Sequence, residues 1–293
     1  MNCIILGAGK IGLDLYFKCK KEKIFKQIFI FNLNKHSEGA IFCRKNKINC
    51  SHDGIKGAVK ELKKNRLNII YDATSANSNV KNEKILRKLL YRNYLINLTP
   101  SIIGNYMVPY NNQKNIKKKI NLITCGGQSS IPLIIELKKH LKNKINYVEL
   151  VSSISSVSAG KATRENINEY IYNTQNAIKF LTKIRNNKVI INLNPANPPV
   201  NMMNSIFFET KNFLKEADII KIRTAIKLVN NRIKKYIPGY NAKFFRTFKS
   251  NIFRVTVRVV GQGDYLPTYS GNLDIITSSA AYIGKLIHEK NNY

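Results

Sequence analysis

Short apolar runs alternate with amphipathic segments over the first 125 residues. Leu13 to Lys23 has helical spacing, with Leu15, Cys19 and Lys23 on one stripe. Because the apolar runs between such segments are hydrophobic on both faces, they predict strands of a parallel sheet that helices cover on both sides. The predicted strands are 2–7, a run that ends at Asn34, 67–74, 93–99 and 120–125.

The pattern changes after residue 125. "SSIPLIIELKKHL" predicts a helix capped by Ser129 or Ser130 with Pro132 in its first turn. A second amphipathic helix is predicted to begin at Thr163 as its cap. Apolar and polar residues alternate strictly over 253–259, which predicts a half-exposed strand of an antiparallel sheet lying on helices.

The sequence "GAGKIG" follows the first predicted strand and opens a helix. In this spacing Gly7 permits a tight turn, Gly9 lets a pyrophosphate approach the backbone, and Gly12 permits close helix packing. The alternative is a glycine turn of an α/β fold that binds nothing. An acid usually holds the ribose hydroxyls after the second strand, but Asn32 and Asn34 stand there, so the motif does not decide between NAD and NADP.

These patterns predict an α/β protein of two domains, and 293 residues suffice for two cores. We expect a Rossmann-type domain with a parallel sheet over residues 1–125. An α+β domain with a mainly antiparallel sheet follows over 126–271, and a C-terminal helix over about 272–290 packs back on the first domain.

Cys125 stands where the apolar run "LITC" gives way to "GGQSS". The carboxyl edge of an open parallel sheet is where ligands bind, and the positive end of the following helix would lower the pKa of a thiol there. The flanking glycines would leave room for an adduct and free backbone donors. The competing interpretation is a small buried filler. The other cysteines, at 3, 19, 43 and 50, are interpreted as structural.

Composition narrows the function classes. The five cysteines have no CxxC spacing, which disfavours a disulfide framework or a metal site and predicts reduced thiols of a cytoplasmic protein. The net charge of +32 comes from lysines spread along the whole chain, so we do not expect a nucleic-acid surface. Neither a signal peptide nor a run of 18 apolar residues is found, and no membrane association is expected.

Ordered blocks of sequence resemble the acetylating acetaldehyde dehydrogenases that partner 4-hydroxy-2-oxovalerate aldolase. The glycine motif and "TCGGQSSIP" are joined by blocks that extend over nearly the whole chain. These blocks are "YDATSANSNVKN" (71–82), "INLTPSIIGNYMVP" (96–109), "SSVSAGKATRENINEY" (155–170), "LNPANPP" (193–199), "IPGY" (237–240) and "YLPTYSGNLDIITSSA" (265–280).

The resemblance implies a reaction in which a short-chain aldehyde, NAD and coenzyme A give an acyl-CoA and NADH. It places the acyl-thioester nucleophile at Cys125. It assigns a catalytic and dimerisation role to the second domain, a homodimer or a hetero-oligomer with the aldolase as the assembly, and aromatic hydrocarbon catabolism as the setting. The implied cofactor-binding residues, with Asn34 from the ribose position, are Gly7, Ala8, Gly9, Lys10, Ile11, Gly12, Ser158, Ala159, Gly160, Lys161, Ala162, Thr163, Arg164, Glu165, Asn166 and Asn272.

Two departures from the family pattern stand out. An aspartate near the catalytic thiol is matched here by Asn204, and an amide can position a group but cannot take a proton. The segment 241–264 is shorter than in relatives, which bears on assembly. Both motivate the alternative of a catalytically impaired protein that serves as a structural partner of an aldolase.

Overall fold

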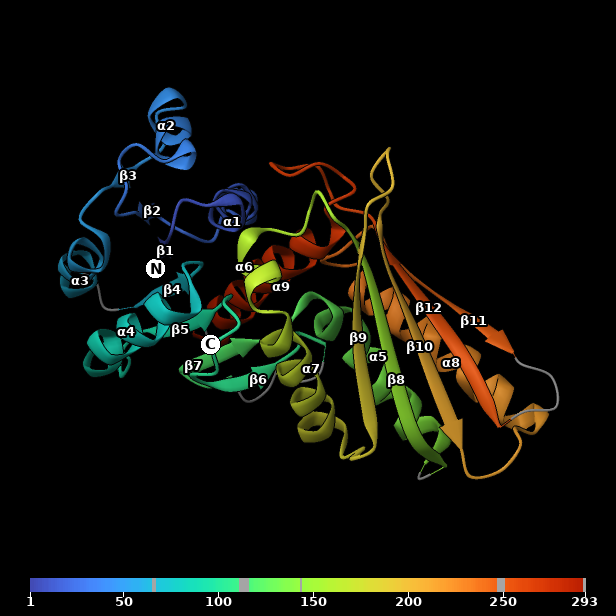
Figure 1. Cartoon of the computed structure of the whole chain (residues 1–293). Coiled ribbons are helices and arrows are strands. Elements are labelled where there is room, and N and C mark those ends of the chain that lie inside the picture. Colours follow the sequence, from blue (N-terminus) through green and yellow to red (C-terminus); the bar gives the residue numbers. More distant parts are fainter. Residues whose placement is uncertain (65–66, 111–115, 143, 247–250, 292–293) are drawn as a thin grey trace. The chain divides into compact units, whose positions relative to one another are not determined.

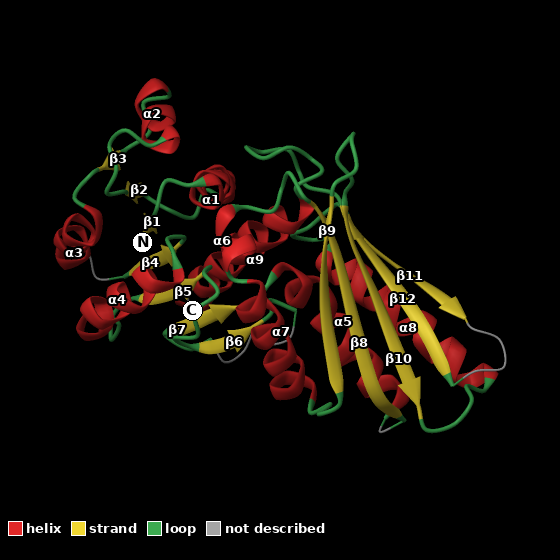
Figure 2. Ribbon diagram, in the orientation of Figure 1, coloured by secondary structure: helices red, strands yellow, loops and turns green. Residues whose placement is uncertain are grey.

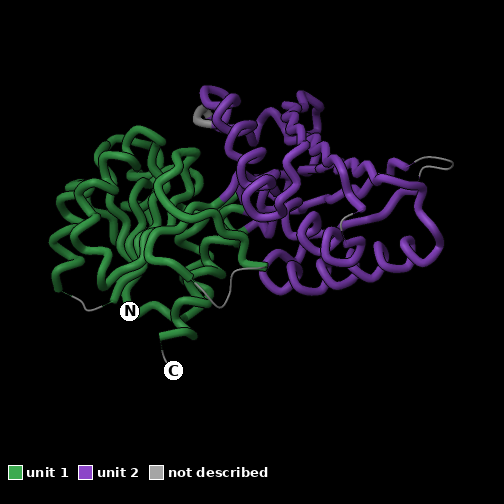
Figure 3. Tube along the Cα trace, turned by 90° about the horizontal axis from the view of Figure 1, so that it is seen from below, with its two compact units in different colours: residues 1–122, 264–266, 276–293 green, residues 123–263, 267–275 purple. Residues whose placement is uncertain are grey.

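The computed structural model describes residues 1–64, 67–110, 116–142, 144–246 and 251–291, without the side chains of 161 and 162. The chain divides into two compact units, which Figure 3 shows in different colours. Unit 1 comprises Met1–Leu122, Asp264–Leu266 and Ile276–Tyr293, and unit 2 comprises Ile123–Gly263 and Pro267–Ile275.

Unit 1 is built on a seven-stranded sheet in the order β3-β2-β1-β4-β5-β7-β6, and all of its strand pairs are parallel (Figure 1). Its strands are β1 (Asn2–Leu6), β2 (Ile28–Phe31), β3 (Cys50–Ser51), β4 (Asn68–Asp72), β5 (Tyr94–Asn97), β6 (Asn105–Met107) and β7 (Lys119–Leu122). Its helical segments are α1 (Lys10–Glu22), α2 (Glu38–Lys45), α3 (Gly54–Lys64), α4 (Ala76–Leu86), the short η1 (Arg87–Leu89) and most of α9 (Gly271–Asn291).

Every residue of β1 and β4 is buried, as the runs of apolar residues in these strands predict. The strand order reverses at β1, because β2 lies on one side of it and β4 on the other. In open parallel sheets ligands bind beyond the carboxyl ends of the strands at this reversal. The glycine motif therefore leaves β1 at the position where a ligand site is expected.

Unit 2 contains a five-stranded sheet in the order β11-β12-β10-β8-β9. Its pairs are antiparallel apart from β8 and β9, which are parallel. The strands are β8 (Ile145–Ser155), β9 (Asn187–Asn194), β10 (Met202–Thr210), β11 (Tyr240–Arg246) and β12 (Ile252–Val259). The helices are α5 (Cys125–Leu141), α6 (Lys161–Glu165), α7 (Ile167–Thr182) and α8 (Glu216–Ile233).

Helices α5, α7 and α8 pack on one face of this sheet, which Figure 2 shows in yellow. The predicted alternation over 253–259 is confirmed in β12, where Phe253, Val255, Val257 and Val259 are fully buried. The residues between them point to the opposite face and keep partial exposure. We call this opposite side the open face, because no helix among the described residues of unit 2 lies on it in Figure 2.

The fold class is confirmed: a parallel Rossmann-type sheet and a mainly antiparallel second sheet. Two predicted helix starts in unit 2 are wrong. Helix α5 begins at Cys125 rather than near Ser130, because the Thr124 side chain caps it by accepting a hydrogen bond from the Gly127 N–H. Pro132 therefore lies inside the helix. Thr163 is not a cap but lies inside α6, which begins at Lys161, and α7 begins separately after Asn166, which interrupts the helical backbone.

Candidate functional site

A hollow of about 450 Å3 lies at the carboxyl end of β1. Its lining residues come from the glycine loop, the start of α1, the loop after β2, the start of α2 and the segment 264–266. They are Ala8, Gly9, Lys10, Leu13, Asn32, Ser37, Glu38, Gly39 and Tyr265. Four of these nine residues, Ala8, Gly9, Lys10 and Asn32, are positions that the sequence analysis expects at a cofactor site. The other five lie outside the expected positions.

The glycine loop has the geometry of a phosphate cradle. Gly7 has a φ of +99°, and a Cβ on Gly12 would lie 2.0 Å from the Gly7 carbonyl oxygen, so the helix and the loop touch backbone to backbone. Gly9 differs, because a Cβ placed there meets nothing within 4 Å. Gly9 is also the N-cap of α1 and offers no side-chain oxygen to the helix N–H groups. A dinucleotide pyrophosphate fits this arrangement of free space and helix N-terminus.

Polar contacts close the far side of the hollow. Ser37 caps α2 by accepting a hydrogen bond from the Ala40 N–H at 3.3 Å. Asn32 donates to the Ser37 hydroxyl at 3.0 Å and to the Asn34 carbonyl at 2.9 Å. The Asn34 side chain accepts from the His36 N–H, and Asn34 is exposed and does not line the hollow. Glu38, the exposed first residue of α2, lines the hollow together with Asn32.

Tyr265 enters the hollow from a distant part of the sequence. The Asp14 carboxylate, fully buried on α1, accepts hydrogen bonds from the backbone N–H groups of Tyr265 and Leu266 at 3.3 Å. The Tyr265 ring stacks on Phe17 at 6.0 Å between centroids. Burial, followed by the negative charge of Glu38, raises the pKa of Tyr265, so its hydroxyl stays a hydrogen-bond donor.

Cys125 is the first residue of α5, and 8% of its surface is exposed. Its sulfur lies 3.6 Å from the hydroxyl of Tyr170, which belongs to α7. The Gly126 N–H donates to the same hydroxyl at 3.0 Å, and that hydroxyl lies 3.3 Å from the Ser152 oxygen on β8. Helix α5 contacts both α7 and β8 within unit 2, and Figure 1 labels all three elements. The sequence reasoning did not identify Tyr170 or Ser152.

Gly126 makes this contact sterically possible. A Cβ on Gly126 would lie 2.3 Å from the Tyr170 hydroxyl and 2.4 Å from the Ser152 hydroxyl. The glycines after Cys125 were expected to leave backbone donors free, and this expectation is wrong. The Gly126 N–H is bound to Tyr170, and the Gly127 N–H is bound to Thr124 at 3.2 Å.

Burial raises the pKa of the Cys125 thiol above its ordinary value. Hydrogen bonds from the Tyr170 hydroxyl and the Gly126 N–H oppose this effect and favour the thiolate. The expected lowering of the pKa at the helix N-terminus is therefore outweighed by the loss of water around the sulfur. Among the described residues, no group of three or more His, Cys, Asp and Glu side chains could hold a metal ion.

Asn204 lies on β10, opposite Ser152 of β8, and is fully buried. Its side-chain nitrogen donates to the hydroxyl of Ser130 at 3.0 Å, to the hydroxyl of Ser129 and, at 3.4 Å, to the Gly126 carbonyl. The structure thus brings Asn204 to the first turns of the helix that begins with Cys125. Its side-chain oxygen has no hydrogen-bond partner among the described residues.

The second predicted cofactor segment, Ser158–Asn166, comprises the loop before α6, α6 itself and the break at Asn166 before α7. Asn272, at the start of α9, donates to the Ser158 carbonyl at 3.5 Å, so two of the predicted cofactor positions in unit 2 lie together. A Cβ on Gly160 meets nothing within 4 Å. Arg164 of α6 donates to the Ser156 carbonyl at 2.6 Å, and this hydrogen bond ties the helix to the loop that precedes it.

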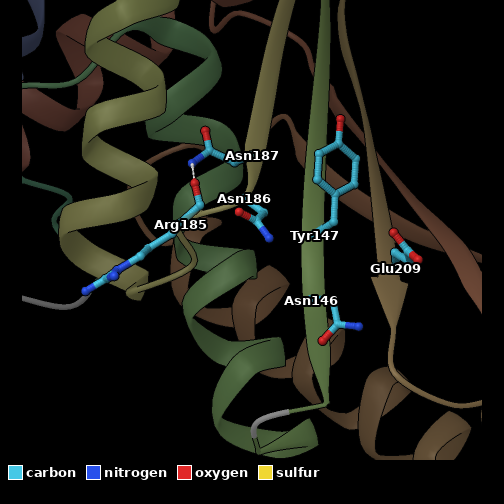
Figure 4. A pocket seen from close by; sticks show the side chains of 6 residues that line it. All are labelled: Asn146, Tyr147, Arg185, Asn186, Asn187 and Glu209. Carbon is cyan, nitrogen blue, oxygen red and sulfur yellow. Dashed lines mark hydrogen bonds between the residues drawn. The ribbon is translucent and has the colours of Figure 1, made fainter.

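A second hollow, of about 700 Å3, lies at one end of the sheet in unit 2. Figure 4 shows its lining side chains, which are Asn146, Tyr147, Arg185, Asn186, Asn187 and Glu209. Glu209 is partly exposed between the buried Phe208 and Thr210, and Tyr147 is its paired residue on β8, so both belong to the open face. Burial and then the hydrogen bond to Glu149 raise the pKa of Tyr147 to about 12. None of the predicted site residues is among its described lining residues.

The comparisons with known proteins identify the family. The family model described as "Prokaryotic acetaldehyde dehydrogenase, dimerisation" matches residues 125–267. An acetaldehyde dehydrogenase of Pseudoalteromonas translucida is 34% identical over 285 residues, with 96% of this chain and 92% of that protein covered. One of Burkholderia pseudomallei is 35% identical, with 97% and 93% covered. The chain therefore belongs to the acetaldehyde dehydrogenase family, a family of oxidoreductases.

Solved structures show the same fold at low sequence identity. Aspartate semialdehyde dehydrogenase II of Vibrio cholerae aligns with a TM-score of 0.64 and 10% identity over 96% of this chain and 97% of that chain. The structure of the same protein complexed with ASA gives a TM-score of 0.61 with 12% identity, over 100% and 99%. In addition, the described part of the chain contains no helix with the length and apolar character needed to span a bilayer.

The two glycines predict separable effects on stability and binding. Gly12→Ala forces a methyl group against the Gly7 carbonyl and should lower the unfolding free energy by about 1–3 kcal/mol. The backbone at Gly9 permits alanine and the space around it is free, so the melting temperature of Gly9→Ala should match the wild type. The added methyl group would take space that a dinucleotide pyrophosphate needs, so dinucleotide affinity should fall. Differential scanning fluorimetry and calorimetric NAD titration measure both. Unchanged NAD affinity in Gly9→Ala would contradict the placement of the pyrophosphate over this residue.

Proposed function

We propose that this chain is an acylating acetaldehyde dehydrogenase. It oxidises acetaldehyde, or another short aliphatic aldehyde, with NAD and coenzyme A to acyl-CoA and NADH. The observation that carries the proposal is the buried thiol of Cys125 at the start of α5, which lies 3.6 Å from the Tyr170 hydroxyl, in a member of this family. The cytoplasmic location expected from the cysteine pattern is part of the proposal.

The proposed chemistry begins with the Cys125 thiolate. Its sulfur attacks the aldehyde carbonyl carbon, a C–S bond forms, and the carbonyl oxygen takes up a proton to give a thiohemiacetal. Bound NAD supplies the hydride acceptor, and the loss of hydride and proton leaves an acyl thioester on Cys125. The thiolate of coenzyme A then attacks this carbonyl, the bond to the Cys125 sulfur breaks, and the free thiolate is regenerated.

Asn204 has a positioning role in this proposal. Its amide can neither accept nor supply a proton at neutral pH, so it cannot act as a general base. Its nitrogen holds the Ser130 hydroxyl and the Gly126 carbonyl on the first turns of α5. The proton of the thiol therefore leaves to water, and the pKa of Cys125 sets the thiolate fraction.

The substitution Cys125→Ser should reduce NADH formation from acetaldehyde, NAD and coenzyme A by at least three orders of magnitude, because a serine hydroxyl is a far weaker nucleophile than a thiolate. Absorbance at 340 nm measures the rate. Intact-mass analysis without coenzyme A should find one acyl group on the wild type and none on Cys125→Ser. Cys50→Ser is the matched control, since Cys50 belongs to β3 of unit 1. Wild-type protein that binds NAD but forms no NADH would overturn the proposal.

The second candidate function is the impaired structural partner of an aldolase, and the amide at position 204 favours it. The same assay separates the two. An inactive wild type that keeps its fold and binds an aldolase would support this second function.

Glu38 supports a preference for NAD over NADP. Its carboxylate lines the hollow beside Asn32 and Ser37, at the end of β2 where a ribose binds in this fold. A carboxylate accepts hydrogen bonds from ribose hydroxyls, and it repels a 2′-phosphate. NAD is therefore the proposed cofactor, with Gly7 to Gly12 holding the pyrophosphate.

The substitution Glu38→Gln should weaken NAD binding by roughly fivefold, about 1 kcal/mol for an exposed hydrogen bond, and should narrow the difference between NAD and NADP. Competition titrations with both nucleotides give the two dissociation constants. Glu61→Gln on α3 is the control, because it removes a negative charge from unit 1 away from the lining residues. An unchanged ratio of the two constants would argue against Glu38 as the specificity determinant.

We also propose that two copies of the chain associate through the open face of the sheet in unit 2. The family model that matches residues 125–267 is described as a dimerisation model. The matched residues include this sheet. Met203 of β10 and Ile252 of β12 are large apolar residues on this face, with 46% and 42% exposure. Residues 247–250, which belong to the shortened segment 241–264, lie outside the described residues. The aldolase implied by the resemblance is the proposed second partner.

Met203→Asp should shift the protein from dimer to monomer, because the dimer would bury an unpaired carboxylate. Sedimentation velocity at several concentrations measures the change. Ile220→Asp on α8, at a residue that is 64% exposed, is the control and should leave the sedimentation coefficient unchanged. A Met203→Asp protein that sediments as the wild type would refute this interface. Addition of the candidate aldolase to the wild type tests for a heavier hetero-oligomer in the same experiment.

A further inference from the structure

Tyr170 is the one side chain of α7 that reaches the Cys125 sulfur by a hydrogen bond in the described structure. It is 6% exposed, and its hydroxyl contacts three groups from two elements, α5 and β8. These are the Cys125 sulfur at 3.6 Å, the Gly126 N–H at 3.0 Å and the Ser152 hydroxyl at 3.3 Å. Four residues further along α7, Thr174 contacts the Thr124 cap at 2.5 Å. Two successive turns of α7 thus hold the start of α5.

The hydroxyl of Tyr170 carries one hydrogen, and two acceptors compete for it. The Gly126 N–H already donates to its oxygen, so the hydrogen points either to the Ser152 oxygen or to the Cys125 sulfur. A neutral thiol is a weak acceptor, whereas a thiolate is a charged one, and hydrogen bonds to charged acceptors are roughly twice as strong. The hydrogen is therefore held by Ser152 while the thiol is neutral and turns to the sulfur when the thiol ionises.

Other groups around the sulfur do not supply a charge. Asn204 faces the first turns of α5 from β10, and Tyr240 of β11 donates to the Ser129 carbonyl. The hydrogen bond of Tyr170 is the side-chain interaction that lowers the Cys125 pKa against the effect of burial. Burial raises the pKa of Tyr170 well above its ordinary value, so this hydroxyl keeps its proton throughout the range in which a thiol titrates.

We propose that Tyr170 is a positioning residue that stabilises the Cys125 thiolate by turning its hydroxyl from Ser152 to the sulfur. This inference rests on the proposed role of Cys125 as the nucleophile. In the step itself the S–H bond breaks and its proton leaves to water. The hydrogen bond from Tyr170 to Ser152 is exchanged for one to the sulfur, and Tyr170 retains its own proton.

Two substitutions should move the titration of Cys125 in opposite directions. Tyr170→Phe removes the donor and should raise the apparent pKa by about one unit, a roughly tenfold loss of thiolate at pH values below it. Ser152→Ala removes the competing acceptor and should lower the pKa. Tyr172→Phe, on the same helix and 62% exposed, is the matched control and should change nothing.

The measurement is the pH dependence of the alkylation rate of Cys125 by iodoacetamide, followed by mass spectrometry of the Cys125 peptide. Thiolate absorbance at 240 nm, taken as the difference from Cys125→Ser, gives the same inflection without a reagent. A structural role of Tyr170 would lower the melting temperature and leave the inflection in place, which would overturn the proposal. An upward shift in Ser152→Ala would also overturn it, and this arm still decides if Tyr170→Phe does not fold.

The proposed function and the proposed role of Tyr170 can be refuted independently of each other. If Cys125→Ser abolishes acyl-CoA formation while Tyr170→Phe leaves the inflection unchanged, the function stands and the role of Tyr170 is wrong. If Cys125→Ser retains activity, the proposed function is wrong whatever the titration shows.

Discussion

The absence of a side chain at position 126 is the constraint on which the surroundings of Cys125 depend. A single Cβ there would overlap the hydroxyls of Tyr170 and Ser152, which reach this point from α7 and β8. Because backbone and hydroxyls meet directly, the sulfur, the cap of α5 and the sheet are held at fixed distances. The same principle applies in unit 1, where Gly12 brings α1 against the glycine loop.

The site balances burial against ionisation. Taking the Cys125 sulfur out of water disfavours the thiolate, and neutral donors restore part of the lost stabilisation. The amide of Asn204 brings no negative charge to the first turns of α5, but it cannot take a proton, and its side-chain oxygen has no hydrogen-bond partner among the described residues.

The sequence predicts the layers of the fold better than their ends. Runs such as 2–7 and the alternation over 253–259 identify β1 and β12, because burial on two faces or one face leaves a direct pattern. The predicted cap of α5, Ser129 or Ser130, lies five or six residues after the observed cap Thr124, since capping depends on backbone geometry and not on residue type alone. The cofactor loop and Cys125 are visible as local motifs.

The remaining residues of the candidate sites come from elements distant in sequence, which no local pattern connects. Tyr170 reads as one more apolar position of an amphipathic helix, and Tyr265 belongs to a block far from the glycine motif. Ser37 and Glu38 did carry a usable signal, because a serine followed by an acid marks a helix start after the second strand. Contacts of this kind follow from the three-dimensional arrangement of α7, α2 and the segment 264–266.

Unit 1 is assembled from segments that are far apart in the sequence, which affects the order in which its parts are synthesised. Tyr265 and the larger part of α9 belong to unit 1, although the whole of β8 to β12 precedes them in the chain. A nascent chain released from the ribosome only up to residue 122 lacks one wall of the nucleotide hollow and the helix that ends the sequence. Unit 2 has most of its residues available earlier. The hollow beside the glycine loop is thus completed only after synthesis has passed the region that carries the thiol.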